Sequence, residues 1–369
     1  MQKCIVVWLL LSLNAVSANT ISISLPTEVV NGIDKRYSSL RPGDTLMLEP
    51  GSRGPIQFSN LNGDKDNYIV IINGHAGCDI EGKNRPYGIS IRNCRYIRLT
   101  GNGARGVTYG IRINSVEQTG AGLGISDKTS DIEVAFLEIA NINGPGILCK
   151  TNPDCNTGGF TQYNTLIHHD YVHHTKTEGM YIGSTAYEGV HTKCDSITAL
   201  LMPPVLEGVR VFDNRVEYTG WDGIQISDAI KVECFRNNIR FDSRQDLEWQ
   251  NSGIVIGGGA SGNFYDNNIS KGKGYGISCF GKDSVAIIRN TINMDSTINK
   301  TAIYVNDKLA DSTTCYTIMD NSIRTEFLPA INLANGKYHS SHNIINNKIL
   351  TRTKGKTIHI DAVRSQVKQ

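Results

Sequence analysis

The chain is poor in proline, lacks Cys-x-x-Cys pairs and has almost no net charge. Ten of its 369 residues are proline, and no two cysteines have the spacing of a zinc site. Its 37 basic and 35 acidic residues leave a net charge of +2. This balance excludes a broad basic field for nucleic acid or an anionic membrane. Helical periodicity is also missing beyond the first 18 residues, which favours an all-β chain.

The one long apolar run lies at the N-terminus, in residues 5–13, and small residues follow it up to Ala18. This pattern predicts a secretory signal peptide over residues 1–18 and an exported chain over 19–369. No later stretch approaches the roughly 20 apolar residues of a membrane helix, so we expect no membrane insertion. We interpret residues 19–369 as a single domain.

One short apolar motif, most often x-Gly-Ile-x-Ile, returns along the chain. It begins at residues 87, 109, 145, 178, 222, 252, 275, 301, 329 and 356. From 222 onward the spacing is 23 to 30 residues, which is too long for hairpins. Short strands repeated at this period predict coils stacked into a parallel solenoid, with Ile224 and Ile226 in the core and Gln225 facing outward.

A second motif, with a central asparagine, lies between the later repeats. Its members are Asn214, Asn237, Asn267, Asn290, Asn321 and Asn347. Asparagine tolerates left-handed backbone angles at turns and bonds to backbone through its side chain. Stacked coil upon coil, these side chains are expected to bond to one another.

Several segments carry a resemblance to a known family, among them PGDTLMLEPG, HHTKTEGMYIGS, TGWDGIQIS and NSGIVIGGG. They resemble secreted repeat proteins of the pectate-lyase-like superfamily, over most of residues 20–365. The resemblance implies an all-β fold, a single-stranded right-handed parallel β-helix of about ten coils. It also implies a shallow groove along one sheet that often holds a polysaccharide.

Side chains that face outward from this ladder are the expected substrate-binding groups. Tyrosine, amide and charged groups are suited to sugar rings. The predicted substrate-binding residues are Arg112, Tyr181, Trp221, Gln225, Tyr275 and Tyr304.

Glu178 and Asp222 occupy the same place in two successive repeats, so we expect them on neighbouring strands roughly 5 Å apart. Three interpretations stay open. They act as acid and nucleophile of a glycoside hydrolase, they bind Ca²⁺ together with Asp228, or they only bond to turn backbone.

The leading functional hypothesis is a secreted, monomeric protein that binds an acidic polysaccharide and cleaves it by cation-assisted β-elimination. The resemblance implies a Lys or Arg base, and Lys150, one rung before Glu178, is the expected one. Alternatives are a non-catalytic glycan-binding or matrix protein and a glycoside hydrolase.

Four histidines lie within seven residues: His168, His169, His173 and His174. We expect His168 in the core, at the place of a buried Phe212, and His169 and His173 to point away from the core. An imidazole serves as a general acid or base or as a metal ligand, and His174 joins the predicted catalytic residues.

Residues 184–208 form an insertion that lengthens the repeat spacing around Glu178, and we expect it to wall the groove beside Glu178 and Asp222. Its Cys194 is predicted to form a disulfide with Cys155, in another insertion. The other mature cysteines are either further disulfides or small buried residues. Asn268 and Asn299 have the sequence context of N-glycosylation sites.

Overall fold

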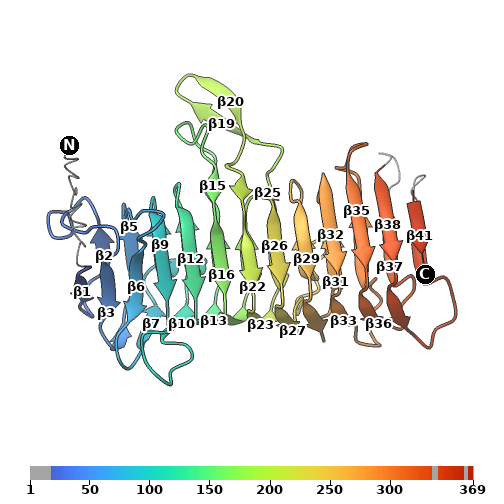
Figure 1. Ribbon diagram of the computed structural model, residues 1–369, viewed down its shortest axis with the longest axis horizontal. Helices are drawn as coiled ribbons and strands as arrows, with labels where there is room; N and C mark the ends of the chain where they lie inside the picture. Colours follow the sequence, from blue (N-terminus) through green and yellow to red (C-terminus); the bar gives the residue numbers. More distant parts are fainter. Residues whose placement is uncertain (1–17, 335–339, 361–364, 369) are drawn as a thin grey trace, which may run out of the picture.

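The computed structural model describes residues 18–334, 340–360 and 365–368. The predicted signal peptide therefore lies outside the described residues, apart from Ala18. No helix occurs in the described part of the chain, and the strands form long parallel sheets that wind as a right-handed parallel β-helix (Figure 1).

Three sheets run along the solenoid, and each coil contributes one strand to each of them in most of the stack. Sheet A has 13 strands: β1 (Thr20–Ile23), β3 (Thr45–Leu48), β6 (Ile69–Asn73), β9 (Arg95–Thr100), β12 (Ser130–Ala135), β16 (Thr165–His168), β22 (Arg210–Phe212), β26 (Val232–Phe235), β29 (Gly262–Tyr265), β32 (Ser284–Ile288), β35 (Cys315–Met319), β38 (Ser341–Ile345) and β41 (Ser365–Lys368). Sheet B has 12 strands: β2 (Val29–Asn31), β5 (Ile56–Ser59), β8 (Tyr87–Arg92), β11 (Ala121–Ser126), β14 (Ile147–Cys149), β18 (Met180–Ile182), β24 (Ile224–Ile226), β28 (Ser252–Ile256), β31 (Tyr275–Cys279), β34 (Ile303–Asn306), β37 (Ile331–Ala334) and β40 (Ile358–Ile360). Sheet C has 11 strands: β4 (Gly51–Arg53), β7 (Cys78–Gly82), β10 (Ile111–Val116), β13 (Leu137–Ile142), β17 (Tyr171–Thr175), β23 (Arg215–Thr219), β27 (Asn238–Arg240), β30 (Asn268–Ser270), β33 (Thr291–Asn293), β36 (Ser322–Arg324) and β39 (Lys348–Leu350).

The repeated motif forms sheet B, with one exception. The segment beginning at residue 109 lies in β10 of sheet C, and the sheet B strand of that coil is β11 instead. Both segments bury two apolar residues that are separated by one less buried residue, Ile111 and Ile113 in β10 and Leu123 and Ile125 in β11, so the motif alone did not distinguish them. The described strands also outnumber the ten predicted coils, with 12 in sheet B.

The core is a single column of aliphatic side chains from all three sheets. Ile224 and Ile226 are fully buried, as predicted. The glycine before them is required by close packing between coils. A Cβ atom on Gly223 would lie 2.5 Å from the carbonyl oxygen of Gly253 and 2.6 Å from Cγ2 of Ile239. Since such contacts are too short for carbon, the ladder keeps glycine there.

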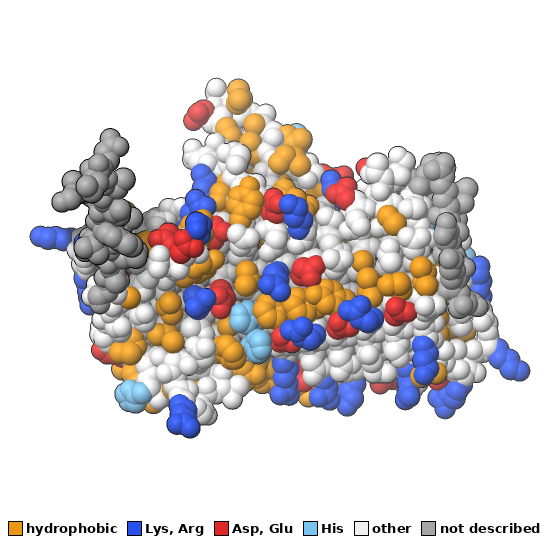
Figure 2. All heavy atoms as spheres, viewed as in Figure 1, with side chains coloured by type: hydrophobic (Ala, Val, Ile, Leu, Met, Phe, Trp, Pro, Cys, Tyr) orange, Lys and Arg blue, Asp and Glu red, His pale blue; other side chains and the backbone are white. Residues whose placement is uncertain are grey.

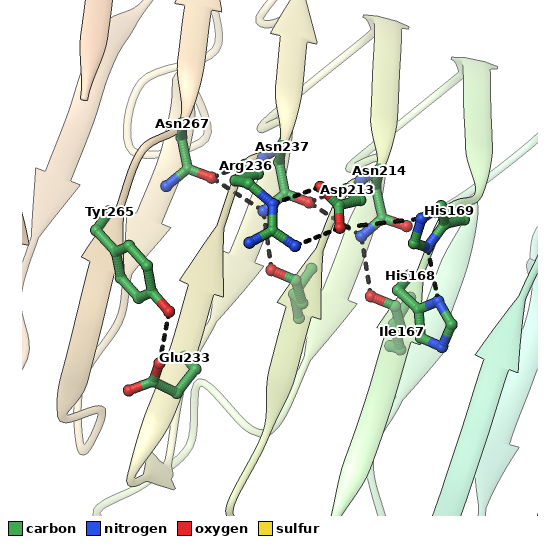
Figure 3. Close-up of polar contacts among 11 residues, drawn as sticks. Ile167, His168, His169, Asp213, Asn214, Glu233, Arg236, Asn237, Tyr265 and Asn267 are labelled. Atoms are coloured by element: carbon green, nitrogen blue, oxygen red, sulfur yellow. Dashed lines mark hydrogen bonds and ion pairs between the residues drawn. The ribbon is translucent and has the colours of Figure 1, made fainter. Parts of the chain in front are cut away.

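The predicted asparagine ladder is confirmed at the turns between sheets A and C (Figure 3). The Nδ2 group of Asn237 donates to Oδ1 of Asn267 at 3.0 Å and to the carbonyl oxygen of Val211 at 2.9 Å. Its own Oδ1 accepts from the side chain and the backbone N–H of Asn214. Each asparagine in the stack is therefore satisfied by its neighbours.

The insertion at 184–208 carries an antiparallel hairpin, β19 (Val190–Cys194) and β20 (Ile197–Leu201), that projects from the solenoid (Figure 1). Three short strands, β15 (Gln162–Tyr163), β21 (Leu206–Glu207) and β25 (Ala229–Ile230), pair beside its base. The predicted disulfide between Cys155 and Cys194 is present. The other six described cysteines are unpaired, and five of them are buried.

The insertion does not wall the space beside Glu178 and Asp222, contrary to expectation. It follows β18, whereas Glu178 precedes that strand. Tyr187 of the insertion packs against Gly258 and Gly259, beyond the far end of β28. The insertion and the acid pair thus lie at opposite ends of the same strands.

Candidate functional site

Glu178 and Asp222 lie on neighbouring coils, as predicted. Strands β18 and β24 are paired with Met180 opposite Ile224, which places the two acids opposite each other two residues earlier. The backbone N–H of Gly179 donates to the carbonyl oxygen of Asp222 at 2.9 Å. Both acids stand in the turns that lead from sheet C into sheet B.

Both acids are buried, which separates them from substrate. Glu178 is 3% exposed and Asp222 is 0% exposed. Oδ1 of Asp222 accepts the backbone N–H of Ser252 at 2.7 Å. Burial, followed by the charge of Glu178, raises the pKa of Asp222 well above its usual range. Burial also raises the pKa of Glu178. Two buried carboxyl groups within turns do not suit a glycosidase dyad, which needs both groups at the sugar.

The predicted calcium set does not assemble. Asp222 precedes β24 and Asp228 follows it, so six residues of extended chain, roughly 20 Å, separate them. Among the described residues, no three His, Cys, Asp or Glu side chains form a group able to hold a metal ion. Calcium requires six to eight oxygen ligands. These residues do not fit it, and no step below is assigned to a metal.

The outer face of sheet B carries four of the predicted substrate-binding residues, Tyr181, Gln225, Tyr275 and Tyr304, and the predicted base Lys150 lies beside it. Tyr181, Gln225 and Tyr304 belong to one outward row, in which Val255 and Ser278 lie between the last two. Gln225 faces outward as predicted, but it is only 3% exposed. Nζ of Lys150 lies 4.8 Å from the centroid of the Tyr181 ring.

Tyr275 stacks on Tyr304 at the C-terminal end of this row, with ring centroids 5.3 Å apart. Nζ of Lys300 lies over the Tyr275 ring, 5.3 Å from its centroid. Sheet B therefore presents two separate lysine and tyrosine clusters, one at each end of a row of smaller side chains.

Arg112 does not belong to this face, and its assignment there was wrong. It lies on β10 of sheet C, where its guanidinium makes two hydrogen bonds to Asp79, at 2.7 and 2.8 Å. The error has the same origin as the misplaced repeat at residue 109.

The first histidine pair lies on and beside sheet A. His168 is opposite Phe212 in the register, as predicted, but both side chains face outward and the core positions are Ile167 and Val211. The His168 ring begins an external aromatic row that continues through Phe212, Phe235 and Tyr265. Figure 2 shows histidine side chains at one end of a hydrophobic row on this face, bordered by charged side chains.

The second histidine pair lies where sheet C turns toward sheet B. His173 faces outward from sheet C, and its Nε2 lies 3.3 Å from Oε1 of Glu138. His174 has a left-handed φ of 53° and stacks on Tyr218, with centroids 4.8 Å apart. Tyr218 stacks in turn on Phe241 at 4.6 Å.

Two adjoining cavities of 320 and 360 Å³ open beside His174 and share Thr175, Tyr218 and Arg244 in their walls. Lys176 lines one and Lys273 the other. We call this pair of cavities the basic cavity. None of its described lining residues is acidic. Asp246, two residues after Arg244, lies 3.9 Å from Lys300 instead.

Trp221 stands next to the basic cavity, and its Nε1 donates to Oε1 of the lining residue Gln245 at 3.1 Å. Of the predicted catalytic residues, His174 alone is among the residues that line it. The cations Lys176, Arg244 and Lys273 were not predicted from the sequence. His174 and Tyr218 each lie four residues before the matched acids Glu178 and Asp222, and this shared place in the repeat was a usable signal for the aromatic stack.

No family model and no curated protein sequence matches the chain. Solved structures match its fold. The GH136 lacto-N-biosidase from Eubacterium ramulus superposes with a TM-score of 0.52 at 13% identity, covering 95% of this chain and 68% of that one. The A-module of the mannuronan C-5 epimerase AlgE4 from Azotobacter vinelandii gives 0.45 at 13% identity, covering 88% and 91%. Pectate lyase Pel9A gives 0.44 at 11% identity, covering 95% and 82%. The likeness to the lacto-N-biosidase structure supports the parallel β-helix fold of the chain.

No helix of the described residues is long and apolar enough to cross a membrane.

Proposed function

We propose that this protein is exported and binds an acidic polysaccharide in the basic cavity. The observation that carries the proposal is the set of cationic side chains, Lys176, Arg244 and Lys273, around an opening whose described lining has no carboxylate. An uncompensated group of cations attracts and orients a polyanion. The Cys155–Cys194 disulfide supports export, because disulfides persist in oxidising compartments.

The arrangement of the cations favours a linear polymer. Lys176 follows β17, Arg244 lies beyond the end of β27, and Lys273 follows β30. These strands span three steps of sheet C, from β17 through β23 and β27 to β30, or about 14 Å. The cations thus follow the solenoid axis, and a polyuronate lying along that axis presents carboxylates to successive turns.

The solved β-helix proteins named above include enzymes of mannuronan and pectate, which are acidic polysaccharides. At the measured identities these neighbours support the fold, and the choice of ligand class rests on the charge of the cavity. Binding isotherms with polygalacturonate, alginate and a neutral glucan test it. Affinity for at least one acidic polymer, lost on raising the salt concentration, is expected. Equal binding of the neutral glucan would contradict the proposal.

A second step, cleavage by β-elimination, is favoured by the imidazole of His174 beside these cations. In this reaction a cation neutralises the uronate carboxylate and a base removes the C5 proton. The electron pair forms the C4–C5 double bond, the C4–O bond breaks, and the leaving oxygen takes a proton. We assign the base to His174 and not to Lys150. Lys150 follows β14, at the end of that sheet B strand that lies away from the turns between sheets C and B.

The product distinguishes an enzyme from a binding protein. Unsaturated uronate absorbs in the ultraviolet, so its appearance on incubation with the bound polymer supports the lyase. Binding without any absorbing product would leave the non-catalytic glycan-binding protein as the function.

A further inference from the structure

Three groups form a continuous chain that ends at the basic cavity. Oε1 of Glu138, on β13, lies 3.3 Å from Nε2 of His173, on β17. Nδ1 of His173 lies 2.8 Å from Nδ1 of His174. His174 lines the cavity and is exposed, whereas the side chain of His173 is 15% exposed.

The proton positions in this chain follow from the chemistry of its groups. An ionised carboxylate only accepts hydrogen bonds, so Nε2 of His173 carries the hydrogen in that contact. A neutral imidazole has one N–H, which leaves Nδ1 of His173 as an acceptor. The hydrogen between the two rings therefore belongs to Nδ1 of His174, and a neutral His174 then has its lone pair on Nε2.

We propose that Glu138 and His173 are positioning residues that hold His174 as the Nδ1–H tautomer, with Nε2 as the proton-accepting atom of the basic cavity. The inference rests on the proposed function of that cavity. A proton taken from a bound sugar would go to Nε2 of His174. The resulting imidazolium keeps its Nδ1–H bond to His173, and the charge of Glu138 stabilises it through the chain.

The surroundings of His173 support a neutral ring there. Tyr171 stacks on it with centroids 4.2 Å apart, and Arg215 lies over Tyr171 on its strand neighbour. Burial lowers the pKa of His173, while the hydrogen bond and charge of Glu138 and the charge of Glu217 act in the opposite direction. His174, its other charged neighbour, lowers the pKa further when protonated. A neutral His173 is the form that the tautomer argument needs.

The protein contains a matched control, because a second glutamate contacts a second pair of adjacent histidines in the same order. Nε2 of His168 lies 3.5 Å from Oε1 of Glu133, and its Nδ1 lies 2.8 Å from Nδ1 of His169. None of these three residues lines the basic cavity. The substitution Glu133→Gln therefore removes a carboxylate charge at the corresponding position, next to His168, and this position is away from His174.

Ring-nitrogen NMR of the full chain without polysaccharide tests the inference. In the wild type, His174 should be the Nδ1–H tautomer at high pH. Glu138→Gln no longer fixes the hydrogen on Nε2 of His173, and His173→Phe, which keeps a ring on Tyr171, removes the acceptor for Nδ1–H, so both should release the tautomer of His174. Glu133→Gln should leave the tautomer of His174 unchanged.

An Nε2–H tautomer of His174 in the wild type, or an Nδ1–H tautomer that both Glu138→Gln and His173→Phe leave unchanged, would overturn the inference. These outcomes are independent of the product assay. The tautomer result with no unsaturated product sustains the positioning role and removes the lyase, whereas product with the wrong tautomer removes the positioning role alone.

Discussion

The two pairs of adjacent histidines have the same local geometry and different surroundings. In each pair the first ring meets a glutamate through Nε2 and its partner through Nδ1, at 2.8 Å in both pairs. The second residue of each pair, His169 or His174, has a left-handed φ, of 57° and 53°. The left-handed backbone at the second residue, shared by both pairs, accompanies the shared geometry.

The difference lies beyond the second ring. Nε2 of His169 faces Asp213 at 3.9 Å, and Arg236 holds that carboxylate with two hydrogen bonds of 2.7 and 2.6 Å (Figure 3). His174 instead lines a cavity with Lys176. The first pair ends beside an ion pair, and the second pair ends at an opening lined by cationic side chains. The same geometry of two adjacent rings thus has different surroundings, because different residues lie beyond the second ring.

The largest expected contrast between the pairs is in catalysis. His174→Asn should reduce formation of unsaturated product at least about 100-fold, because it removes the general base. His169→Asn should leave the rate close to that of the wild type. Asparagine tolerates the left-handed backbone angle at both positions. Initial rates measured by ultraviolet absorbance check both, and an equal loss in the two variants would break the contrast.

A smaller contrast is expected in binding. Arg244→Gln removes one cation of the basic cavity and should weaken binding of an acidic polymer about tenfold, equivalent to about 1.4 kcal/mol. Arg105→Gln removes the same charge from the exposed loop between β9 and β10 and serves as the control. Isotherms at low and moderate salt check this. Similar affinities for both variants would argue that overall charge, and not the cavity, holds the polymer.

The smallest expected effect concerns the stability of the turn that follows His169. Asp170 directly follows His169 and occupies the place before Asn214 in the asparagine ladder. Its Oδ1 accepts the backbone N–H of Leu137, but Oδ2 is buried and has no hydrogen-bond partner among the described residues. Asp170→Asn supplies an Nδ2 donor toward Asn214 and should raise the free energy of unfolding by about 1 kcal/mol at neutral pH.

The pH dependence of the free energy of unfolding explains why the substitution of Asp170 should be stabilising at neutral pH. Burial raises the pKa of Asp170 well above its usual range in the folded state. The folded chain then binds a proton that the unfolded chain releases above its ordinary pKa of about 3.9, so this group costs stability as pH rises. Asp170→Asn should remove that slope. Denaturant unfolding from pH 4 to 7 measures it, and an unchanged slope would show that Asp170 is not the group responsible.

The sequence predicted the stack of coils because each repeat must bury the same aliphatic positions and keep its glycine. It also predicted the asparagine ladder, since asparagines that return at one place in successive coils bond to one another and to the turn backbone. Arg112 was misplaced because strands of all three sheets share one alternation, and the residue pattern does not show which sheet a strand joins.

The site was predicted less well, for two physical reasons. Glu178 and Asp222 have the repeat register that a dyad needs, but their burial depends on how the turns pack over them. Arg244 and Lys273 come from turns of different lengths, so no common spacing relates them to His174. The histidine cluster and Trp221 were the predicted features that led toward the cavity.

The most direct test of the central claim compares the two faces. Binding of an acidic polysaccharide is measured for Lys176→Gln with Arg244→Gln, and separately for Lys150→Gln with Tyr304→Phe on sheet B. We predict a loss of more than about tenfold for the first pair and wild-type affinity for the second. Retained affinity in the first pair, with loss in the second, would contradict the account and return the ligand to the outer face of sheet B.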